Sequence, residues 1–507
     1  MKEEPQVILP EDRYDAELLK NVRPAGWENP TPAPVYNLVV LGAGIAGLVA
    51  ARGAAELGAK VALVEKRFIG GDCLNLGCVP SKTIISSSRV SEEVHEAAEH
   101  GVRVICGSEA DFPAVMERMR RLRARISEKD SARSFKELGV DVFLGEGRFT
   151  GPDTLSVAGA TLRFKKALIA TGARPFHPPI EGLAEAGYLT SETVFNLTER
   201  PARLAVLGGG AIGCEMAQAF QRLGVKTTIL HNKPRLMDRE DRDASAIIER
   251  AFNREGVQAV LGNWLLKKVE ISGGEKVLHL EDNGNKRHIP VDSLLVSVGR
   301  VPNVDGLGLA EAGVRYDPRA GVQVDGYLRT TNPRIYAAGD ICLRLKFSHT
   351  AEAAAKVVLQ NALLLGRRRF DSLVIPWTTF TDPEVAHVGA YAEGAEQRGV
   401  QVETFMERFE NVDRAILEGE EEGFAKIHVR KGTDEIIGAT IVARKGGEMI
   451  NEITMAMQYK IGLAKLADVV HPYPTEAEAI KHCADKALKA RLTPKTRGAI
   501  KKWLKTG

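Results

Sequence analysis

Apolar residues along the chain gather in short β-branched runs that alternate with longer Ala- and Leu-rich segments. The run at 35–41 leads through three closely spaced glycines into an Ala-rich segment at 48–57, and a second β-rich run follows at 60–64. These patterns predict a strand, a glycine turn, a helix and a second strand. That order is typical of a dinucleotide-binding unit with parallel strands.

The same arrangement recurs further along the chain. Residues 203–207 predict a strand, 214–223 a helix and 226–230 another strand, again with a glycine-rich turn after the first strand. One glycine signature alone also occurs in ordinary strand-to-helix turns. Two complete units in one chain indicate two dinucleotide sites.

Glycines in both turns allow a tight bend and close approach of the backbone to a pyrophosphate. They are Gly42, Gly44 and Gly47 in the first unit and Gly208, Gly210 and Gly213 in the second. The first unit ends in Glu65, where a carboxylate is expected to hold ribose hydroxyls. The second ends in His231, followed by Lys233 and Arg235. Bases there tolerate a 2′-phosphate, so we expect NADPH, with NADH as the alternative.

The rest of the chain predicts more strands and helices and a change of texture near residue 375. Strands are predicted at 140–144, 161–170, 294–298 and 334–338, and a helix at 350–365. Beyond residue 375 the segments are β-rich, with strands predicted at 423–429 and 436–442 and helices at 448–460 and 476–489. The change predicts a separate domain.

Length and composition set the class of protein. The 507 residues exceed what one hydrophobic core organises, so about three domains are expected. An apolar fraction of 44%, a charged fraction of 27% and a net charge of +3 exclude a disordered protein and give no reason to expect nucleic acid as a partner. The N-terminal sequence lacks a basic start followed by an apolar core, so we expect the cytoplasm.

Two cysteines stand out among the six of the chain. Cys73 and Cys78 flank Leu-Asn-Leu-Gly, and Lys82 follows on a predicted helix. A disulfide in a reducing cytosol is more often catalytic than structural. The helix N-terminus and Lys82 favour a thiolate at Cys78. The other four are expected to be buried apolar side chains; they are Cys106, Cys214, Cys342 and Cys483.

The passage from Gly70 to Lys82 resembles the signature of the pyridine nucleotide–disulfide oxidoreductases, which include dihydrolipoamide dehydrogenase, glutathione reductase and mercuric reductase. The resemblance runs from residue 36 to about residue 489. It implies an α/β fold with two Rossmann-like dinucleotide-binding domains, for FAD and NAD(P), plus an α+β C-terminal dimerisation domain that forms a homodimer. It also implies that Cys78 faces the flavin and that Cys73 exchanges with substrate.

Further site residues follow from matching the family motifs. The resemblance implies that Lys82 lies near the flavin and pairs with Glu215, and that Asp340 binds the ribityl chain. The other expected cofactor-binding residues are Gly71, Thr171, Gly172, Gly299, Arg300 and Gly339. The predicted domains are an N-terminal arm (1–35), an FAD-binding domain (36–186 and 305–374), an NAD(P)H-binding domain (187–304), a dimerisation domain (375–490) and a basic tail (491–507). No resident metal site is expected.

The segment from His471 to Glu478 bears on the electron acceptor. Disulfide-reducing members carry a His-Pro-Thr motif with a glutamate five residues after the histidine. Here Tyr473 stands in place of that histidine, while Glu478 is present. A phenol titrates near pH ~10 and an imidazole near ~6.5, so Tyr473 is a poor base at neutral pH. His471 is a substitute base one step out of register.

A tyrosine at this position resembles the sequence of mercuric reductase. The resemblance favours a soft metal ion such as Hg(II), or a small thiol or disulfide, as the electron acceptor. The terminal cysteine pair and the Cys-x-x-Cys domain of many mercuric reductases are absent; Cys483, beside His482, is a candidate replacement thiol. Two alternatives stay open. One is a dihydrolipoamide-dehydrogenase-like thiol–disulfide reductase. The other is a slow-turnover FAD/NAD(P)H redox sensor or adaptor.

The two ends of the chain carry their own expectations. The N-terminal arm is expected to be a surface segment with one short helix. From residue 486 onward the tail has eight bases and no acid. With Ile500, Trp503 and Leu504 interleaved, this tail suits weak contact with an anionic membrane surface or a membrane protein. A solvated tail, or one packed across the dimer, is the alternative.

Overall fold

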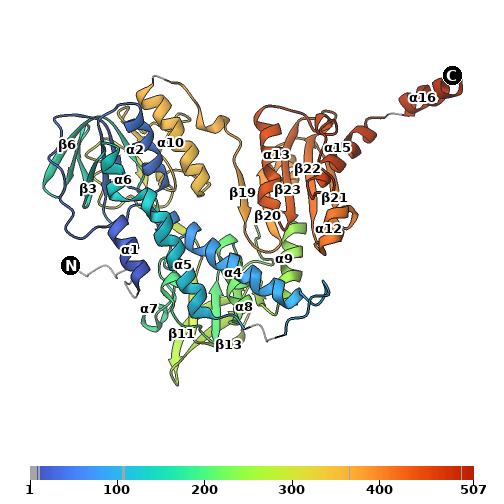
Figure 1. The fold of residues 1–507 in the computed structure, drawn as a ribbon, viewed down its shortest axis with the longest axis horizontal. Coiled ribbons are helices and arrows are strands. Elements are labelled where there is room, and N and C mark those ends of the chain that lie inside the picture. The colour runs from blue at the N-terminus through green and yellow to red at the C-terminus, as the bar shows by residue number, and fades with distance from the viewer. Residues whose placement is uncertain (1–7, 9–11, 106–108, 365, 493, 507) are drawn as a thin grey trace. The chain divides into compact units, whose positions relative to one another are not determined.

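The computed structural model describes residues 8, 12–105, 109–364, 366–492 and 494–506. Cys106 lies outside the described residues. The chain forms two compact units, drawn in Figure 1. The first unit is Met1–Gly209, Ala219–Asn232 and Asn263–Ser372, and the second is Gly210–Gln218, Lys233–Gly262 and Leu373–Gly507. Both units mix helices and sheets, in agreement with the predicted α/β fold class.

The central sheet of the first unit has seven strands in the order β3-β2-β1-β6-β5-β4, with β18 also paired to β6. Their bounds are β1 Tyr36–Leu41, β2 Val61–Glu65, β3 Asp141–Leu144, β4 Gly147–Gly151, β5 Thr154–Val157, β6 Ala160–Ile169 and β18 Ile335–Ala337. β1 pairs in parallel with β2 (Leu38 opposite Val61) and with β6 (Leu38 opposite Lys166). β1 and β2 are mostly apolar, with a run of buried side chains at 38–41 and 61–64, because parallel strands are covered on both faces.

Helices cover this sheet and carry the glycine turn. Those of the first unit are α1 Arg13–Val22, α2 Ile45–Glu56, α3 Gly71–Asn75, α4 Cys78–Glu96, α5 Phe112–Ser127, α6 Ala132–Glu137, α7 Leu183–Ala186 and α10 Ser348–Leu363. α2 packs on α10 so closely that a Cβ at Gly53 would collide with the Leu359 side chain. The Ala- and Gly-rich composition of α2 is therefore a packing requirement.

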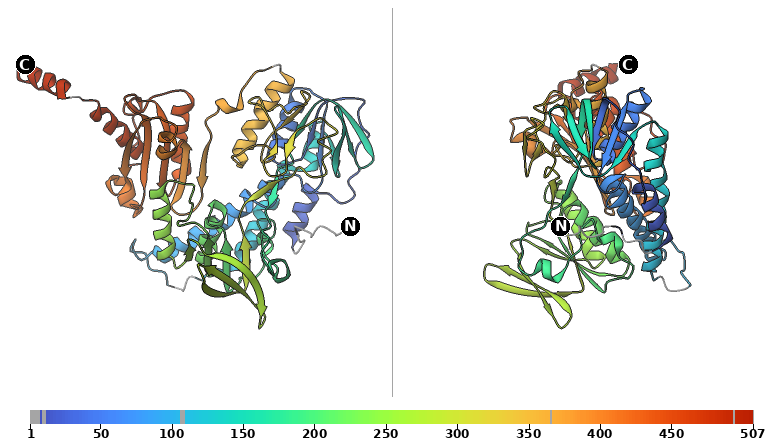
Figure 2. Two further views of the ribbon diagram at one scale, coloured as in Figure 1. Left: turned by 180° about the vertical axis from the view of Figure 1, so that it is seen from behind. Right: turned by 90° about the vertical axis from the view of Figure 1, so that its left-hand side faces the viewer.

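The second dinucleotide-binding unit also has parallel strands. β8 (Arg203–Leu207) pairs in parallel with β9 (Lys226–His231) and with β14 (Ser293–Val296), and α8 (Ala211–Arg222) follows β8. An antiparallel sheet follows, formed by β11 (Leu265–Ser272), β12 (Glu275–Asp282) and β13 (Asn285–Val291). Figure 2 shows it as a long twisted ribbon. The sequence patterns did not predict this sheet. The remaining strands of the first unit are β7 Ala173–Pro175, β15 Arg300–Pro302, β16 Tyr316–Asp317 and β17 Gly321–Val322.

The second unit is built on a five-stranded antiparallel sheet in the order β19-β20-β23-β22-β21. The strands of this unit are β10 Gln258–Leu261, β19 Pro376–Thr379, β20 Glu384–Gly389, β21 Val402–Arg408, β22 Phe424–Arg430 and β23 Ile436–Ala443. Its helices are α9 Arg242–Arg254, α11 Ala392–Glu396, α12 Asp413–Glu418, α13 Gly446–Gln458, α14 Leu463–Leu466, α15 Glu478–Ala490 and α16 Pro494–Thr506. α13 and α15 pack on the sheet and close its core.

The expected N-terminal surface arm is a packed element. Its one helix, α1, is capped by Asp12 and packs against α5. Leu18 and Val22 are fully buried, and the carboxylate of Asp15 is buried with them. The expectation of a short helix is thus confirmed, and one face of this helix is buried against α5. An apolar face on α1, with a charge that has a partner on α5, explains the packing.

Candidate active site

The two predicted redox cysteines lie on consecutive short and long helices. Cys73 is in the middle of α3, and Cys78 is the first residue of α4, directly after Gly77. Gly70, just before α3, has φ +94°, and a Cβ there would collide with the Leu74 side chain. Only glycine adopts that conformation without strain. The glycines therefore let the chain turn sharply enough to bring the two sulfur atoms together.

The side chains of Cys73 and Cys78 are hydrogen-bonded thiols in this structure. Cys73 is half-buried, whereas Cys78 is exposed. The hydrogen bond with Cys78, together with burial, raises the pKa of Cys73. Cys78 lies at the N-terminus of α4, where backbone N–H groups favour a thiolate. The surroundings thus favour a thiolate at Cys78 over one at Cys73.

Ser348 is a functional candidate that the sequence did not indicate. It is the first residue of α10, and its Oγ lies 3.2 Å from the Sγ of Cys78. A hydrogen bond from the same hydroxyl acts to lower the pKa of Cys73. A serine at the start of a helix is usually a cap, so its position in the sequence carries no signal of a redox role.

Asp72 on α3 joins this helix to the predicted residues Arg300 and Asp340. The sequence patterns did not indicate a role for Asp72. Arg300 donates to the Asp72 carboxylate and, over 2.6 Å, to the carbonyl of Ala173, and its Nε lies 3.5 Å from Asp340 Oδ2. Burial raises the pKa of Asp340, while the nearby Arg300 opposes the shift. Because Asp72 precedes Cys73, this cluster ties the predicted flavin-binding residues to α3.

The first glycine turn has the close packing that its sequence predicts. Gly42 has φ +104°, and a Cβ on it would collide with the carbonyl of Ala170. A Cβ at Gly47 would collide with the carbonyl of Gly42 itself. The Glu65 carboxylate accepts a hydrogen bond of 2.7 Å from the N–H of Ala43 and so holds the turn. Its predicted contact with a ribose stays a prediction.

The residues around this turn fit a bound dinucleotide. α2 begins after Gly44, and among the described residues no side chain caps its first N–H groups. Such N–H groups bind phosphate oxygens. Gly172, with φ +68°, and Gly299, with φ +133°, each face open space where a Cβ would project. The hydroxyl of Thr171 donates to the carbonyl of Asn303 over 3.0 Å, which fixes the strand end beside Gly172.

The second glycine turn is similar. Gly208 has φ +115°, and a Cβ on it would lie 2.7 Å from the carbonyl of Ser297. His231, at the end of β9, lies so close to Gly209 that a Cβ there would meet its ring at 2.8 Å. Gly210 faces open space. Gly213 lies in the first turn of α8. The predicted contact of this turn with a nicotinamide nucleotide stays a prediction.

Lys82 and Glu215 lie in different compact units, so their predicted pairing stays a prediction. Lys82 is on the first turns of α4. Glu215 is buried, and its Oε1 accepts a hydrogen bond of 2.9 Å from the N–H of Phe380. The neighbouring Gln218 exchanges two hydrogen bonds of 2.8 Å with the backbone of Asp382. Side chains of α8 therefore anchor the loop before β20.

Tyr473 is exposed, and its hydroxyl donates to Asp413 Oδ2 over 2.7 Å. This hydrogen bond raises the pKa of Tyr473. His471, the substitute base, lies with Nε2 3.2 Å from Glu452. Glu478 accepts a hydrogen bond from the N–H of Thr475 over 3.4 Å and so stabilises the turn before α15.

The remaining described cysteines are buried or partly buried, as expected. Cys483 is fully buried, and its Sγ donates to the carbonyl of Ala425 over 3.3 Å. Burial raises its pKa to about 12. Cys214 is also fully buried, and burial raises the pKa of Cys342 as well. A replacement metal-handling role for Cys483 is thus disfavoured.

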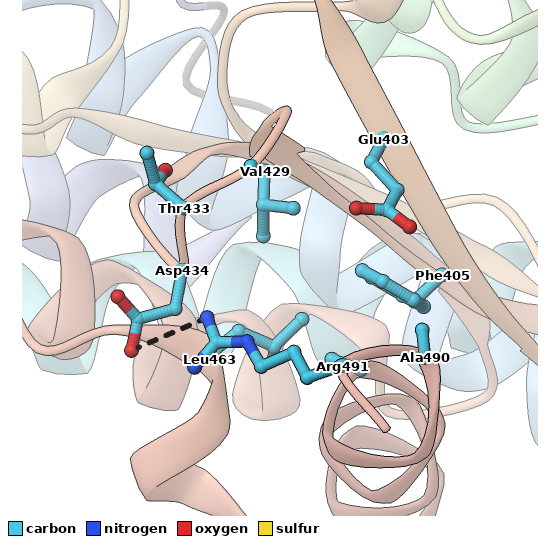
Figure 3. A pocket seen from close by; sticks show the side chains of 10 residues that line it. Glu403, Phe405, Val429, Thr433, Asp434, Leu463, Ala490 and Arg491 are labelled. Carbon is cyan, nitrogen blue, oxygen red and sulfur yellow. Dashed lines mark ion pairs between the residues drawn. The ribbon is translucent and has the colours of Figure 1, made fainter. Parts of the chain in front are cut away.

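A hollow of about 210 Å³ in the second unit is lined by strand and helix residues, as Figure 3 shows. Its polar side chains include Asp434 and Arg491, which form an ion pair of 3.7 Å, and none of the predicted site residues lines it. Within the described ranges, no group of three His, Cys, Asp or Glu residues is arranged to hold a metal ion. The described helices also include none with the length and apolarity needed to cross a membrane.

Comparisons with known proteins agree with this geometry. Residues 36–355 match the family described as pyridine nucleotide-disulphide oxidoreductase, and residues 375–484 match its dimerisation domain. A thiol pair beside dinucleotide-binding turns defines an oxidoreductase that couples bound nucleotides to thiol chemistry. The chain belongs to the pyridine nucleotide–disulfide oxidoreductase family. Members of this family depend on FAD and use NAD(P)H.

Relatives named for different activities have similar sequence identity to this chain. Mercuric reductase of Staphylococcus aureus is 36% identical over 449 residues, covering 89% of this chain and 82% of its own. Dihydrolipoyl dehydrogenase of Geobacillus stearothermophilus is 35% identical over 457 residues, covering 89% and 96%. The solved HOCl-induced flavoprotein disulfide reductase RclA from Escherichia coli has a TM-score of 0.79 at 28% identity, covering 88% and 98%. The relatives support a flavin disulfide oxidoreductase and leave its substrate open.

Proposed function

We propose that this protein is an NADPH-dependent flavoenzyme whose Cys73–Cys78 pair passes electrons to a soft metal ion such as Hg(II). The observation that carries the proposal is the hydrogen-bonded thiol pair at the start of α4, combined with Tyr473 in place of a histidine base. Thiolates are preferred ligands of soft metal ions. The relatives named mercuric reductase add support.

This chain's residues have distinct roles in the proposal. Bound FAD would supply two-electron transfer between a reduced nicotinamide and the Cys73–Cys78 disulfide. The N-terminus of α2 would hold its pyrophosphate, and the Arg300–Asp340 pair would hold its polar groups near α3. Because Arg300 also binds Asp72, the same cluster orients the helix that carries Cys73.

The thiol chemistry balances in two steps. The disulfide gains two electrons and two protons and becomes a dithiol. In the acceptor step the dithiol loses two electrons and two protons and becomes a disulfide again, while Hg(II) gains the two electrons. Cys78 releases its proton first, because the N-terminus of α4 favours a thiolate there, and the proton on Cys73 leaves after the metal ion approaches. Ser348, which contacts Cys78, helps to hold that thiolate.

Tyr473 favours the metal ion over a disulfide. Reduction of a disulfide acceptor by the Cys73–Cys78 dithiol needs a group that takes and returns a proton near neutral pH. The hydrogen bond to Asp413 raises the pKa of Tyr473 further from that range. His471 Nε2 lies 3.2 Å from Glu452, and His471 is one step out of register with the histidine of the disulfide-reducing members. At neutral pH a phenol is therefore poorly suited to the proton transfer that a disulfide acceptor requires.

The test is stopped-flow reoxidation of the anaerobically NADPH-reduced flavoprotein by a Hg(II)–thiol complex, lipoamide or glutathione disulfide, each added separately. We expect rapid reoxidation by Hg(II) alone, lost in Cys73→Ala and kept in Cys483→Ala, whose thiol is buried. Tyr473→His is expected to raise the lipoamide rate by about tenfold or more, because an imidazole is a competent base at neutral pH.

Other outcomes point to other functions. Rapid reoxidation of the unaltered protein by lipoamide would support the dihydrolipoyl-dehydrogenase type of reaction and sink the argument from Tyr473. Indifference to all three acceptors would support a redox sensor or adaptor.

Three further features belong to the proposal. NADPH is preferred because His231 and Lys233 replace the acid that would repel a 2′-phosphate. The ratio of kcat/KM for NADPH to that for NADH checks this preference.

A homodimer follows from the match to the dimerisation domain. The cytoplasm is proposed because a reactive dithiol needs a reducing compartment, and cell fractionation with an antibody to the protein would test it.

A further inference from the structure

We infer that the N-terminal arm positions the redox thiols through a buried chain of contacts from Asp15 through Arg123 to Asn75. The inference rests on the proposed role of Cys73 and Cys78. Asp15 and Arg123 are positioning residues, because neither touches the thiols themselves. The arm precedes residue 36, where the match to the family begins.

The first contact joins two helices. Asp15 on α1 forms an ion pair of 2.8 Å with Arg123 on α5, and the two side chains are 5% and 1% exposed. A charge pair this deeply buried is costly to form and strongly favours the arrangement that satisfies both partners. α1 is therefore held in one position on α5.

The second contact reaches the redox segment. Arg123 Nη1 donates to the backbone carbonyl of Asn75 over 2.9 Å. Asn75 lies between Cys73 and Cys78 and is fully buried. Its own amide Nδ2 donates to the carbonyls of Ile69 and Gly71 over 3.0 and 2.9 Å, which closes the turn before α3. The guanidinium of Arg123 thus connects α1 of the N-terminal arm to Asn75, which lies between Cys73 and Cys78.

The end of α1 adds a parallel connection. The N–H of Ile69 donates to the carbonyl of Val22 over 3.0 Å. The guanidinium of Arg23 donates to the carbonyls of Lys66 and Arg67. The arm therefore fixes the segment from Lys66 to Asn75 both at its start and at its end. This rigidity holds the sulfur atoms of Cys73 and Cys78 close to each other.

Rigid placement of two thiols favours closure of their disulfide. In a glutathione buffer the dithiol reacts with one glutathione disulfide to give the protein disulfide and two glutathione thiols. A more mobile segment between Cys73 and Cys78 lowers the effective concentration of one thiol at the other. We therefore expect Asp15→Asn to lower this equilibrium constant about tenfold, which corresponds to about 30 mV for a two-electron couple. Arg123→Lys should do the same, because an ammonium cannot bridge Asp15 and Asn75 as the guanidinium fork does.

The structure offers a matched control on the same pair of helices. Asp12 accepts a hydrogen bond of 2.6 Å from Arg120, also on α5. Within the part of the chain that the structure describes, the Arg120 guanidinium donates to Asp12 alone. Asp12→Asn removes that ion pair but keeps an amide oxygen to cap α1. We expect it to change the equilibrium constant less than about twofold, because among the described residues the Asp12–Arg120 pair makes no hydrogen bond to the segment from Cys73 to Cys78.

The experiment equilibrates the holoprotein and the three variants anaerobically with glutathione buffers, traps the thiols by alkylation and measures the oxidised fraction of Cys73 and Cys78 by mass spectrometry. Hydrogen exchange of the peptide spanning α3 and Gly77 is measured alongside and should be faster in Asp15→Asn and Arg123→Lys only. Equal effects of Asp12→Asn and Asp15→Asn, or no effect of either, would overturn the inference.

The two readouts separate the inference from the proposed function. If the unaltered protein forms no Cys73–Cys78 disulfide in any buffer, the redox proposal fails. Hydrogen exchange then still decides whether the arm orders the segment. A disulfide that forms normally, with an unchanged equilibrium in Asp15→Asn, leaves the redox proposal standing and removes the role of the arm.

Discussion

Cys73 and Cys78 differ in what surrounds each sulfur atom. The pKa of Cys73 is raised by its hydrogen bond with Cys78 and by burial, and Ser348 acts in the opposite direction. Removing the thiolate of Cys78 should therefore lower the pKa of Cys73, and removing the hydroxyl of Ser348 should raise it. The two effects have opposite signs although both residues touch the same pair.

This difference predicts a pH dependence of thiol labelling. In the reduced flavoprotein, Cys78→Ser is expected to raise the rate of iodoacetamide labelling at Cys73 by about tenfold near pH ~8, because more of Cys73 is then thiolate. Ser348→Ala is expected to lower that rate. The measurement is the labelling rate of the Cys73 peptide as a function of pH. Shifts of the pH profile in the same direction for both variants would contradict this account.

Residues with local signals could be predicted, and residues that act over long sequence distances could not. The glycine turns and the paired cysteines are recognisable because turn geometry and ring closure depend on a few neighbouring positions. Ser348 lies 270 positions from Cys78, and its serine is ordinary in sequence. Asp72 is adjacent to Cys73, but its partner Arg300 became visible only when the strands were placed.

At the scale of elements, the buried parallel strands and their helices were predicted well, and the exposed antiparallel strands were missed. β1 and β2 contain continuous apolar runs at 38–41 and 61–64, as two-sided burial requires. Most of the side chains of β11 and β13 are exposed. With little apolar surface to bury, their sequences lack the alternation that identifies a strand. Hydrogen bonding between neighbours, rather than side-chain pattern, defines this sheet.

The basic tail is an element with a defined face. It forms α16, on which Ile500 and Leu504 are exposed by 42% and 65% and lie one turn apart. Lys501 and Lys505 follow them at the same spacing. An amphipathic helix with lysines beside apolar side chains suits the surface of an anionic membrane.

Vesicle cosedimentation tests this proposal for α16. We expect the holoprotein to bind vesicles that contain phosphatidylserine several-fold better than vesicles of phosphatidylcholine alone, and to lose the difference at high salt because the attraction is screened. Charge reversal with Lys501→Glu and Lys505→Glu should abolish binding without loss of FAD. Equal sedimentation with both lipids would point to a solvated tail or to packing against a second subunit.

At the scale of the whole molecule, the second unit carries exposed apolar side chains that a homodimer would cover. Val470 is 90% exposed and Tyr459 73%, both close in sequence to Tyr473. Large exposed apolar side chains such as these are suited to an interface. The match of residues 375–484 to a dimerisation domain agrees with this interpretation.

We predict that Val470→Asp weakens self-association at least about tenfold, or ~1.4 kcal/mol, because an aspartate would have to be desolvated in the interface. Sedimentation equilibrium measures the change. Ile271→Asp is the matched control, since Ile271 is 58% exposed on β11 of the first unit. Dimers of unchanged strength in Val470→Asp would place the interface elsewhere.

The buried ion pair between α1 and α5 has a consequence for the history of the family. Its two residues are 108 positions apart, and Asp15 lies upstream of residue 36, where the match to the family begins. A lineage that lost the arm would leave the guanidinium of Arg123 buried without a countercharge, and one that replaced Arg123 would strand the carboxylate. The two positions should therefore be inherited together, so the presence of a carboxylate near the start of a homologue can be predicted from an arginine deep inside its catalytic domain.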